Sequence, residues 1–302
     1  MKNLLLYNYN IDIDDFENLQ SGDIAFYIDY NKFYFLKVRQ VKEDIKTIYD
    51  YISKTINNYH YVIKNRFNDL FTEDGQDVYI LLKVNGPEHA EITLYDIVNS
   101  QVSIDENKLN TIKRNNWNTL WSEKIDYLEY QISELGKNHP IVLNSFSYYV
   151  GLAENAIEYF NLIDASKIPL VLSHKRVTYP NISLNYNNPL NLVVDYRIRD
   201  ISEYIKSEFF EGQNVLKDLT WLVGKNVLSS HEYNLLYARL LYPSYYFDTL
   251  TYILEKNTDE DKLLKYIDKV VEYEILLKSV WKLFSRKCSM FKIEWLTNKK
   301  ET

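Results

Sequence analysis

Cysteine and glycine are both scarce in this chain of 302 residues. The single cysteine, Cys288, excludes an internal disulfide and a cysteine-cluster metal site. Arg286 and Lys287 precede it and favour a reactive thiolate, but a partly buried, inert thiol is the expected state. Glycine occurs only seven times and is absent between Ile24 and Arg39, so that stretch offers no glycine-rich loop for binding phosphate.

Long apolar runs and long basic stripes are missing as well. No run approaches the roughly 20 apolar residues that a membrane helix needs, and the start, MKNLLLYNYNIDIDD, turns acidic before a secretory signal is complete. Lys and Arg total 35 against 42 Asp and Glu, which gives a net charge of −7. These features predict a folded, soluble protein of cytoplasmic synthesis, without signal-peptide secretion, membrane span or nucleic-acid partner.

The first 84 residues carry the pattern of a β-rich lobe. Two β-branched and aromatic runs flank a polar turn at residues 29–32, and isoleucines then recur at helical spacing. The expected order is a hairpin over 24–39, a helix over 42–56 and strands over 59–67 and 77–84. Asn85, Gly86 and Pro87 punctuate the chain there. The sequence therefore predicts a lobe over 1–84, a hinge over 85–90 and a second part over 91–302.

The second part is expected to be mainly helical. Residues 141–162 place apolar side chains at helical spacing, and Leu264, Ile267, Val271 and Ile275 continue a helix that starts near Thr258. Two short strands interrupt the helices, over 169–172 and 191–194. The aromatic run from Tyr242 to Phe247 either lines a substrate groove or packs in the core.

The stretch LSHKRVTYPN, residues 172–181, places His174, Arg176 and Asn181 at relative positions 0, +2 and +7. Kinase-like phosphotransferases carry H-x-D-x-x-x-x-N at this spacing. Arginine stands where the aspartate is expected, and no Asp or Glu occurs between Asp164 and Asp195 to replace it. A guanidinium stays protonated at physiological pH, so Arg176 cannot act as a general base.

Four segments together resemble the endospore coat-associated kinase-like proteins of the CotS and YutH type. They are FSYYVGLAENAIEYF at 146–160, LSHKR at 172–176, NPLNLVVDYRIRDISEYI at 188–205 and LLYARLLYPSYYF at 235–247. Those proteins belong to the aminoglycoside/choline phosphotransferase group. The resemblance implies an α+β, bilobal, protein-kinase-like fold with a small β-rich N-lobe and a larger helical C-lobe, whose catalytic loop is degenerate.

The resemblance also implies roles for single residues. In active relatives the histidine is mainly structural, and the asparagine and a later aspartate hold Mg²⁺ against the nucleotide phosphates. His174 is therefore expected to be a structural residue of the loop. Asn181 and Asp195 are metal ligands only if the chain is active, and ATP and Mg²⁺ are its cofactors only in that case.

A lysine on the third strand of such folds contacts phosphates, and Lys37 in FYFLKVR stands where that lysine would be. A solvent-facing strand lysine would have the same pattern, so both interpretations stay open. If Lys37 binds phosphate, its partner on the following helix is Glu43, Asp44 or Asp50, and spacing does not choose among them.

The retained residues also have structural interpretations. Asp195 is followed by Arg197, Arg199 and Asp200, which predicts an ion-pair network as readily as a metal site. Arg176 has three possible roles: it binds an anion, pairs with Asp195 in the vacated metal site, or points to solvent.

Two functions follow from these features. The first is a pseudokinase-like protein of the spore coat or of coat assembly, which acts by binding other proteins, coat components among them. The alternative is an ATP- and Mg²⁺-dependent phosphotransferase, acting on a small molecule or a protein, with rearranged catalytic residues. The substitution at Arg176 favours the first, and the spacing of His174, Asn181 and Asp195 favours the second.

Overall fold

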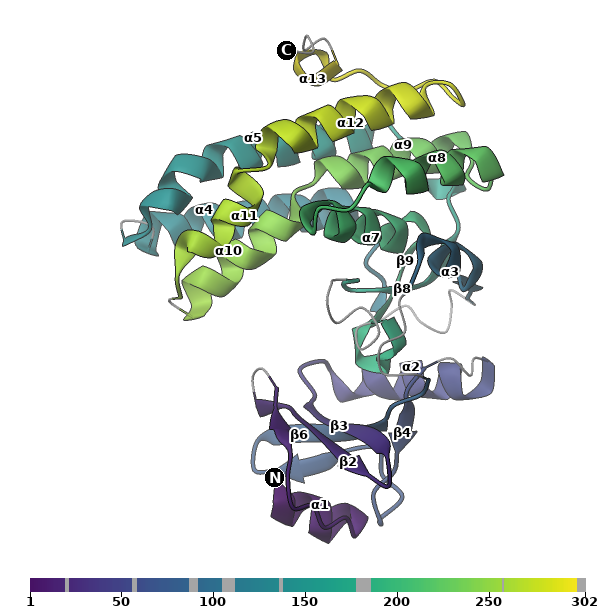
Figure 1. The fold of residues 1–302 in the computed structure, drawn as a ribbon, viewed down its shortest axis with the longest axis vertical. Helices are drawn as coiled ribbons and strands as arrows, with labels where there is room; N and C mark the ends of the chain where they lie inside the picture. The colour runs from purple at the N-terminus through teal and green to yellow at the C-terminus, as the bar shows by residue number, and fades with distance from the viewer. Residues whose placement is uncertain are drawn as a thin grey trace.

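The computed structural model describes residues 1–19, 22–55, 59–86, 92–104, 112–135, 138–177, 186–256 and 258–297. These residues form two lobes, a β-rich lobe that holds the N-terminus and a larger helical lobe (Figure 1). The α+β, bilobal architecture expected from the sequence is confirmed. The predicted lobe boundary falls directly after a strand that ends at Lys83, and residues 87–90 of the predicted hinge lie outside the described residues.

An antiparallel sheet in the order β1-β2-β3-β6-β4, with β5 also paired to β6, forms the N-lobe. The predicted hairpin is β2 and β3, and both Asp29 and Tyr30 at its turn have positive φ, 46° and 65°, as two-residue hairpin turns require. The two-residue strand β1 was missed because it is too short to show alternation. The strands are β1 (Glu17–Asn18), β2 (Ile24–Ile28), β3 (Asn31–Lys37), β4 (Tyr61–Ile63), β5 (Thr72–Asp74) and β6 (Asp77–Lys83).

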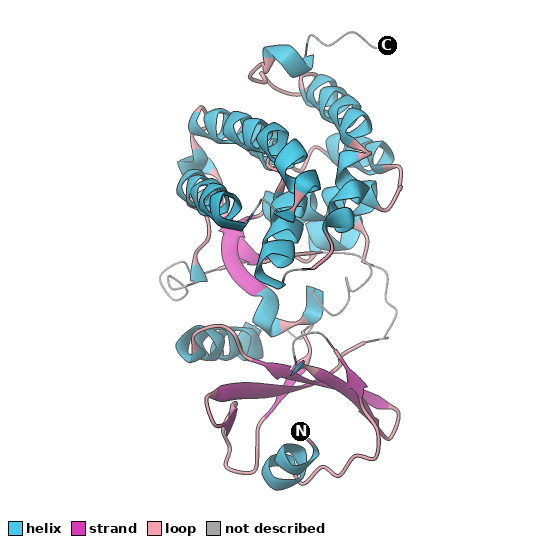
Figure 2. Ribbon diagram, turned by 90° about the vertical axis from the view of Figure 1, so that its left-hand side faces the viewer, coloured by secondary structure: helices cyan, strands magenta, loops and turns pink. Residues whose placement is uncertain are grey.

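Two helices cover opposite faces of this sheet (Figure 2). On one face, Leu5 packs with Phe35 in a small apolar cluster. On the other, Ile48 and neighbouring isoleucines at helical spacing pack with Leu36 in the main core, because successive strand residues point to opposite faces. The helices are α1 (Lys2–Tyr9), which was not predicted, and α2 (Lys42–Thr55), which was.

A second sheet, in the order β7-β8-β9, lies where the two lobes meet. Two hydrogen bonds join the lobes beside it: Gln40 Nε2 donates to the Leu190 carbonyl at 2.7 Å, and His60 N donates to the Asn187 carbonyl at 2.8 Å. Strands β8 and β9 confirm the two short strands expected from the sequence. The elements are α3 (Leu94–Asn99), β7 (Val102–Ser103), β8 (Leu170–His174) and β9 (Leu192–Tyr196).

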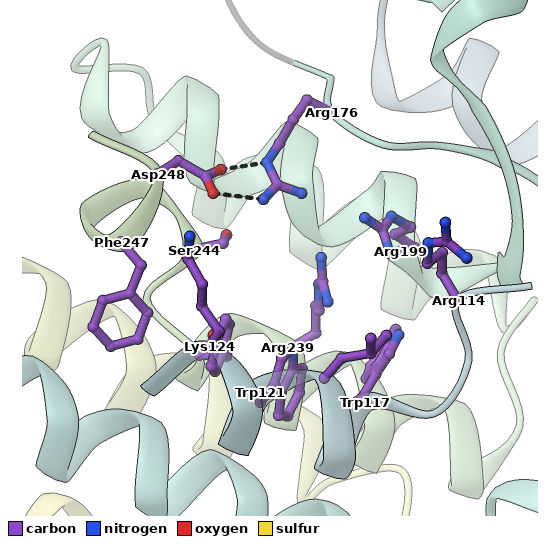
Figure 3. A pocket seen from close by; sticks show the side chains of 12 residues that line it. Arg114, Trp117, Trp121, Lys124, Arg176, Arg199, Arg239, Ser244, Phe247 and Asp248 are labelled. Carbon is purple, nitrogen blue, oxygen red and sulfur yellow. Dashed lines mark hydrogen bonds and ion pairs between the residues drawn. The ribbon is translucent and has the colours of Figure 1, made fainter. Parts of the chain in front are cut away.

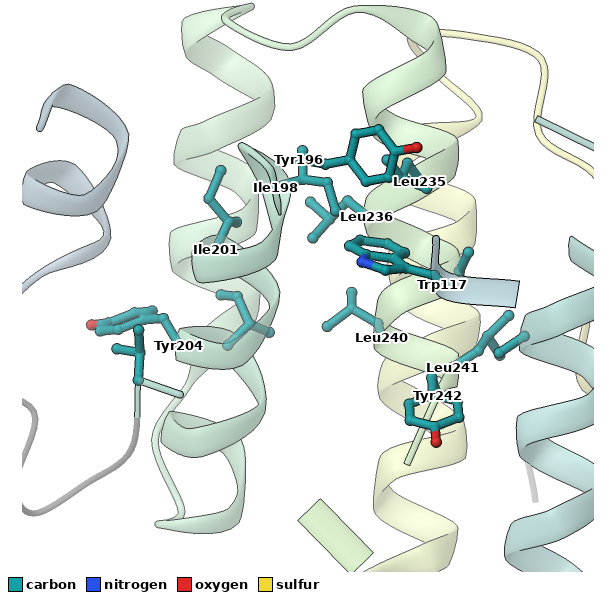
Figure 4. Packing of buried hydrophobic residues seen from close by; sticks show 14 of the residues in the cluster. Trp117, Tyr196, Ile198, Ile201, Tyr204, Leu235, Leu236, Leu240, Leu241 and Tyr242 are labelled. Atoms are coloured by element: carbon teal, nitrogen blue, oxygen red, sulfur yellow. The ribbon is translucent and has the colours of Figure 1, made fainter. Parts of the chain in front are cut away.

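The C-lobe is helical, and its core runs between α7 and α9, with Trp117 at the edge of α4 (Figure 4). The single helix expected from Thr258 onward is divided instead, and Val271 and Ile275 are exposed while Tyr273 and Leu277 are buried. Its helices are α4 (Trp117–Leu135), α5 (Pro140–Asn161), α7 (Ile198–Phe210), α8 (Val215–Lys225), α9 (Ser230–Leu241), α10 (Ser244–Lys256), α11 (Leu264–Ile267), α12 (Val270–Phe284) and α13 (Glu294–Thr297), with short 3₁₀ turns at Ala165–Lys167, Pro189–Asn191 and Glu260–Leu263.

Candidate functional site

Strands β8 and β9 bring two of the predicted site residues to the junction of the lobes. They pair antiparallel, with Val171 opposite Asp195 and His174 opposite Leu192. Both strands are buried throughout, which explains why each begins with three apolar residues, Leu170–Leu172 and Leu192–Val194. His174 ends β8, so the loop that starts at Lys175 leaves from the junction. Asn181 lies in residues 178–185, outside the described part of the chain.

His174 is held rigidly by Asp200 of α7. Its backbone N–H donates to Asp200 Oδ1 at 2.9 Å, and its Nδ1 lies 2.8 Å from Asp200 Oδ2. The ring stacks on Tyr186 with centroids 4.3 Å apart, and only 2% of the residue is exposed. A buried ring fixed by a carboxylate on one side and an aromatic face on the other favours the structural role expected for His174.

Asp195 is fully buried, and hydrogen-bond donors surround its carboxylate. Trp117 Nε1 lies 3.0 Å from Oδ1 and 3.1 Å from Oδ2, and the Tyr196 N–H donates to Oδ1 at 2.7 Å. The Arg199 guanidinium forms an ion pair with Oδ2. Burial raises the pKa of Asp195, while Arg199 and nearby Arg239 act in the opposite direction. The carboxylate is therefore engaged by protein groups on both oxygens.

Arg199 connects this carboxylate to the loop that carries Arg176. Its Nε donates to the His174 carbonyl at 2.7 Å and its Nη2 to the Lys175 carbonyl at 3.0 Å. One guanidinium thus binds Asp195 and two successive carbonyls of the loop. Of the ion-pair network expected after β9, the Asp195–Arg199 pair is confirmed, whereas Arg197 pairs with Glu232 instead.

Arg176 pairs with Asp248 of α10. Its Nε and Nη2 contact the two Asp248 oxygens in a bidentate arrangement, with Nη2 at 2.8 Å, and Glu203 Oε2 lies 3.9 Å from Nε. The pairing with Asp195 considered from the sequence is therefore wrong, because Arg199 takes that place and Arg176 faces α10. Burial would lower the pKa of Arg176, but Asp248 and Glu203 raise it above its ordinary value.

A buried carboxylate, Glu203 of α7, lies at the centre of several cations. Its Oε1 is 3.0 Å from Arg239 Nη2 and 3.1 Å from Lys206 Nζ. Burial would raise the pKa of Glu203, but Lys206, Arg239 and Arg176 lower it well below its usual value. Burial and the neighbouring Arg239 lower the pKa of Lys206 to about 8, although Glu203 acts in the opposite direction. This cluster fixes α7 against α9.

Lys37 lies on the face of the N-lobe sheet that α1 covers. Strand alternation places it with Phe35, whereas Leu36 points to the face that packs with α2. Its Nζ is 2.6 Å from Asp77 Oδ1 at the start of β6, and about a third of the side chain is exposed. This placement favours the solvent-facing interpretation over a phosphate contact paired with α2. Gly22, with φ 84°, lies between β1 and β2, just before the glycine-free residues 24–39.

A cavity of about 250 Å³ opens beside Arg176 (Figure 3). Residues of α4, α9 and α10 form its walls, and the predicted aromatic run contributes Tyr242 and Phe247, which are at once buried and part of the lining. The core packing considered for that run is confirmed for these two residues, and the substrate groove stays a prediction. The lining residues are Arg114, Trp117, Leu120, Trp121, Lys124, Arg176, Arg199, Arg239, Tyr242, Ser244, Phe247 and Asp248.

The described residues do not fit a Mg²⁺ ion at Asp195. Both carboxylate oxygens accept hydrogen bonds, and the positively charged guanidinium of Arg199 is already in direct contact with Oδ2. Within the described ranges, no group of three or more His, Cys, Asp or Glu side chains is arranged to hold a metal. Asp195 therefore acts here as an anchor between α4, β9 and α7.

The partners of the site residues were not found from the sequence. Trp117 lies far along the chain from Asp195, as Asp248 does from Arg176 and Arg239 from Glu203, and no local spacing indicates these contacts. The contact of Glu203 with Lys206 is local. Cys288, by contrast, is partly buried, and burial raises the pKa of its thiol, in line with the inert state expected.

The sheet order, the junction strands and the helical lobe define a kinase-like phosphotransferase fold. An aminoglycoside phosphotransferase from Alicyclobacillus acidocaldarius subsp. acidocaldarius DSM 446 is similar over 93% of this chain and 95% of its own, with a TM-score of 0.58 and 10% identity. A spectinomycin phosphotransferase solved with ADP and spectinomycin is similar over 94% of this chain and 92% of its own, with a TM-score of 0.58 and 13% identity. At these identities the likeness shows the fold alone.

The chain belongs to the family described as "Spore coat putative kinase YutH", which matches residues 2–280. A curated relative, the "Endospore coat-associated protein YutH" of Bacillus subtilis (strain 168), is 25% identical over 206 residues. The match covers 60% of this chain and 61% of that relative, so it spans about three fifths of each. These findings confirm the family resemblance seen in the sequence. In the part of the chain that the structure describes, no helix combines the length and apolar character needed to cross a bilayer.

Proposed function

We propose that this protein is a non-catalytic member of the kinase-like fold that acts in the spore coat, or in its assembly, by binding other proteins. The observation that carries the proposal is the place of Arg176. It stands where the proton acceptor of the fold is expected, and its guanidinium is fixed by Asp248. Since Asp248 and Glu203 raise its pKa, it has no basic form at physiological pH.

The state of Asp195 supports the same proposal. A carboxylate that holds Mg²⁺ for phosphoryl transfer needs oxygens free for the metal. Here Trp117, Tyr196 and Arg199 bind those oxygens, and Arg199 also binds the loop carbonyls. The same contacts that prevent metal binding hold the junction of the lobes in one conformation, which suits a scaffold.

The place of action rests on the family and on the relative. The Bacillus subtilis relative is described as endospore coat-associated. A coat protein without catalysis acts through its surfaces, so its partners are other proteins, coat components among them. Synthesis in the cytoplasm followed by incorporation in the coat would need no signal peptide.

Melting curves with ATP and Mg²⁺ test the proposal. A ligand present at 100 times its Kd stabilises the native state by about 2.7 kcal/mol, which corresponds to a clear rise in Tm. We expect 1 mM ATP with Mg²⁺ to raise the Tm by less than about 1 °C, because the metal ligand is engaged and Lys37 faces away from α2. ATP alone and Mg²⁺ alone are the controls. A rise of more than about 5 °C that needs both ATP and Mg²⁺, together with transfer of phosphate to an acceptor, would contradict the proposal.

The alternative is an ATP- and Mg²⁺-dependent phosphotransferase with rearranged catalytic residues. One observation favours it: Asp248, whose side chain is 42% exposed, lines the cavity and binds the residue at the position of the usual base. In this scheme Asp248 accepts the proton of the acceptor hydroxyl, so Asp248→Asn should abolish any transfer of phosphate that the wild-type protein performs.

A further inference from the structure

The cavity beside Arg176 is basic although the protein is acidic. The whole chain has a net charge of −7, yet among the described residues five cationic side chains and a single carboxylate, that of Asp248, line this cavity. The five are Arg114, Lys124, Arg176, Arg199 and Arg239. Cations gathered in a concave site strengthen the field within it, which favours a negatively charged ligand.

Two of these cations have no carboxylate partner within the described residues. Lys124 Nζ donates to Thr251 Oγ1 at 2.6 Å, and Arg114 Nη1 donates to the Lys113 carbonyl at 2.8 Å. Arg199 and Arg239, by contrast, are paired with Asp195 and Glu203. Burial lowers the pKa of Lys124, and the charges of Asp248 and Glu255 oppose that shift only in part, so its ammonium group is partly desolvated. Such a charge is stabilised when an anion binds.

The cationic groups converge on one space. In Figure 3 the ends of Arg239 and Lys124 point up toward the Arg176–Asp248 pair, and Arg199 and Arg114 lie together at one side. Donors that approach from several directions suit a tetrahedral anion with several oxygens better than a planar carboxylate. A phosphate monoester, with a charge of about −1.5 to −2 at pH 7, matches that arrangement.

The remaining walls are aromatic. Trp121 and Tyr242 stack with ring centroids 4.4 Å apart, and the Arg239 guanidinium lies 4.7 Å from the centre of the Trp117 ring. Leu120 and Phe247 add apolar surface. A volume of about 250 Å³ is small for an enclosed ligand, so the organic group beside the phosphate must be compact.

We propose that this cavity binds a phosphate monoester of a compact apolar or aromatic group. The phosphate takes the place of the Asp248 carboxylate on Arg176 and also contacts Lys124, while the organic group lies against the aromatic wall. In the free protein, the Asp248 carboxylate binds the Arg176 guanidinium and therefore competes with the phosphate of the ligand for it. The proposal does not depend on catalysis, because a protein that transfers no phosphate can still bind such a ligand.

Calorimetric titration with phenyl phosphate at constant ionic strength tests the proposal. We expect saturable binding to the wild-type protein, weakened about tenfold or more by Lys124→Met because a charge-assisted contact is lost. Lys225→Met is the matched control, since it removes one positive charge from an exposed position at the end of helix α8 and should leave the Kd unchanged. Asp248→Asn should strengthen binding several-fold, because it removes the competing carboxylate. Structural damage would weaken binding in both cavity variants, so the opposite signs separate binding from folding.

Further probes separate the possible sources of phosphate. Inorganic phosphate should bind more weakly than phenyl phosphate, since it lacks the group that contacts Trp121. If inorganic phosphate and phenyl phosphate bind with the same Kd, the cavity recognises an anion only, and the assignment of a phosphate monoester as the ligand is overturned. The whole proposal would be overturned if phenyl phosphate showed no saturable binding, or if Lys124→Met left its binding unchanged. It would also be overturned if a phosphotyrosyl peptide bound and phenyl phosphate did not, because that result would indicate a protein partner at this cavity.

Discussion

Replacing Glu203 with glutamine should lower the free energy of unfolding by about 3–5 kcal/mol. Glu203 is 5% exposed and is the buried counter-ion of Arg239 and Lys206, which are themselves 4% and 3% exposed. The change keeps the shape of the side chain but leaves two buried cations without a carboxylate. Urea unfolding of both proteins, compared at equal m-values, measures the difference.

Glu211→Gln is the matched control for this variant. Glu211 follows the last residue of the same helix, α7, and its ion pair with Lys265 is partly exposed, so its loss should cost under about 1 kcal/mol. If Glu203→Gln costs no more than Glu211→Gln, the charged cluster does not stabilise the C-lobe as argued.

Acid unfolding gives a second measure of how much Glu203 contributes to stability. Burial opposes ionisation, but Lys206 and Arg239 lower the folded-state pKa of Glu203 well below the unfolded value of about 4.3. The stabilisation from this group is therefore complete above about pH 4.3 and is lost as the pH falls through the folded-state pKa. The Glu203→Gln variant lacks this titrating carboxyl group. Its free energy of unfolding should therefore fall less steeply below about pH 4.3 than that of the wild type.

Arg199→Met should destabilise the protein by a similar amount, about 3–5 kcal/mol. Asp195 has no exposed surface, and Arg199 is the cation in direct contact with it. Without Arg199 the ionised carboxylate keeps only the neutral donors of Trp117 and Tyr196, and two loop carbonyls lose their donor. Chemical unfolding of the variant measures the loss.

A double-mutant cycle isolates this pair. Asp195→Asn combined with Arg199→Met should cost about 1–3 kcal/mol less than the sum of the two single changes, because the double variant leaves no unpaired charge. Arg197→Met is the control: Arg197 pairs with Glu232, so its effect should add to that of Asp195→Asn within about 0.5 kcal/mol. Additive effects of Asp195→Asn and Arg199→Met would show that the two residues are not coupled.

Much of the fold could be predicted because its signals are local. The hairpin β2–β3, helices α2 and α5, and strands β8 and β9 follow from periodicity and turn residues within a few positions. Strand β1 and helix α1 lack a clear period. The single helix expected from Thr258 is divided in the structure. The apolar spacing also did not identify its buried face, because Tyr273 and Leu277 pack inward whereas Val271 and Ile275 are exposed.

The candidate site could be located but not assembled from the sequence. Asp195 lies in β9 and Arg199 in the first turn of α7, only four residues further along the chain, and this contact was among the predicted network. The partners of Arg176 are 27 and 72 positions away, in α7 and α10, and only tertiary packing brings them to the loop. Lys37 shows a different limit of prediction from sequence. The alternation of a strand assigns its residues to two faces of the N-lobe sheet, but it does not tell which face lies toward the C-lobe.

Transfer of labelled phosphate from γ-labelled ATP with Mg²⁺ tests the central claim most directly. The assay uses the wild-type protein with Asp195→Asn and Asp248→Asn beside it, so that contaminating activity is recognised by its indifference to both changes. Because Arg176 has no basic form and Asp195 is bound by Arg199, we expect the wild type to release or transfer phosphate no faster than a blank without protein. Transfer by the wild type that Asp195→Asn or Asp248→Asn abolishes would contradict the account and establish the rearranged phosphotransferase.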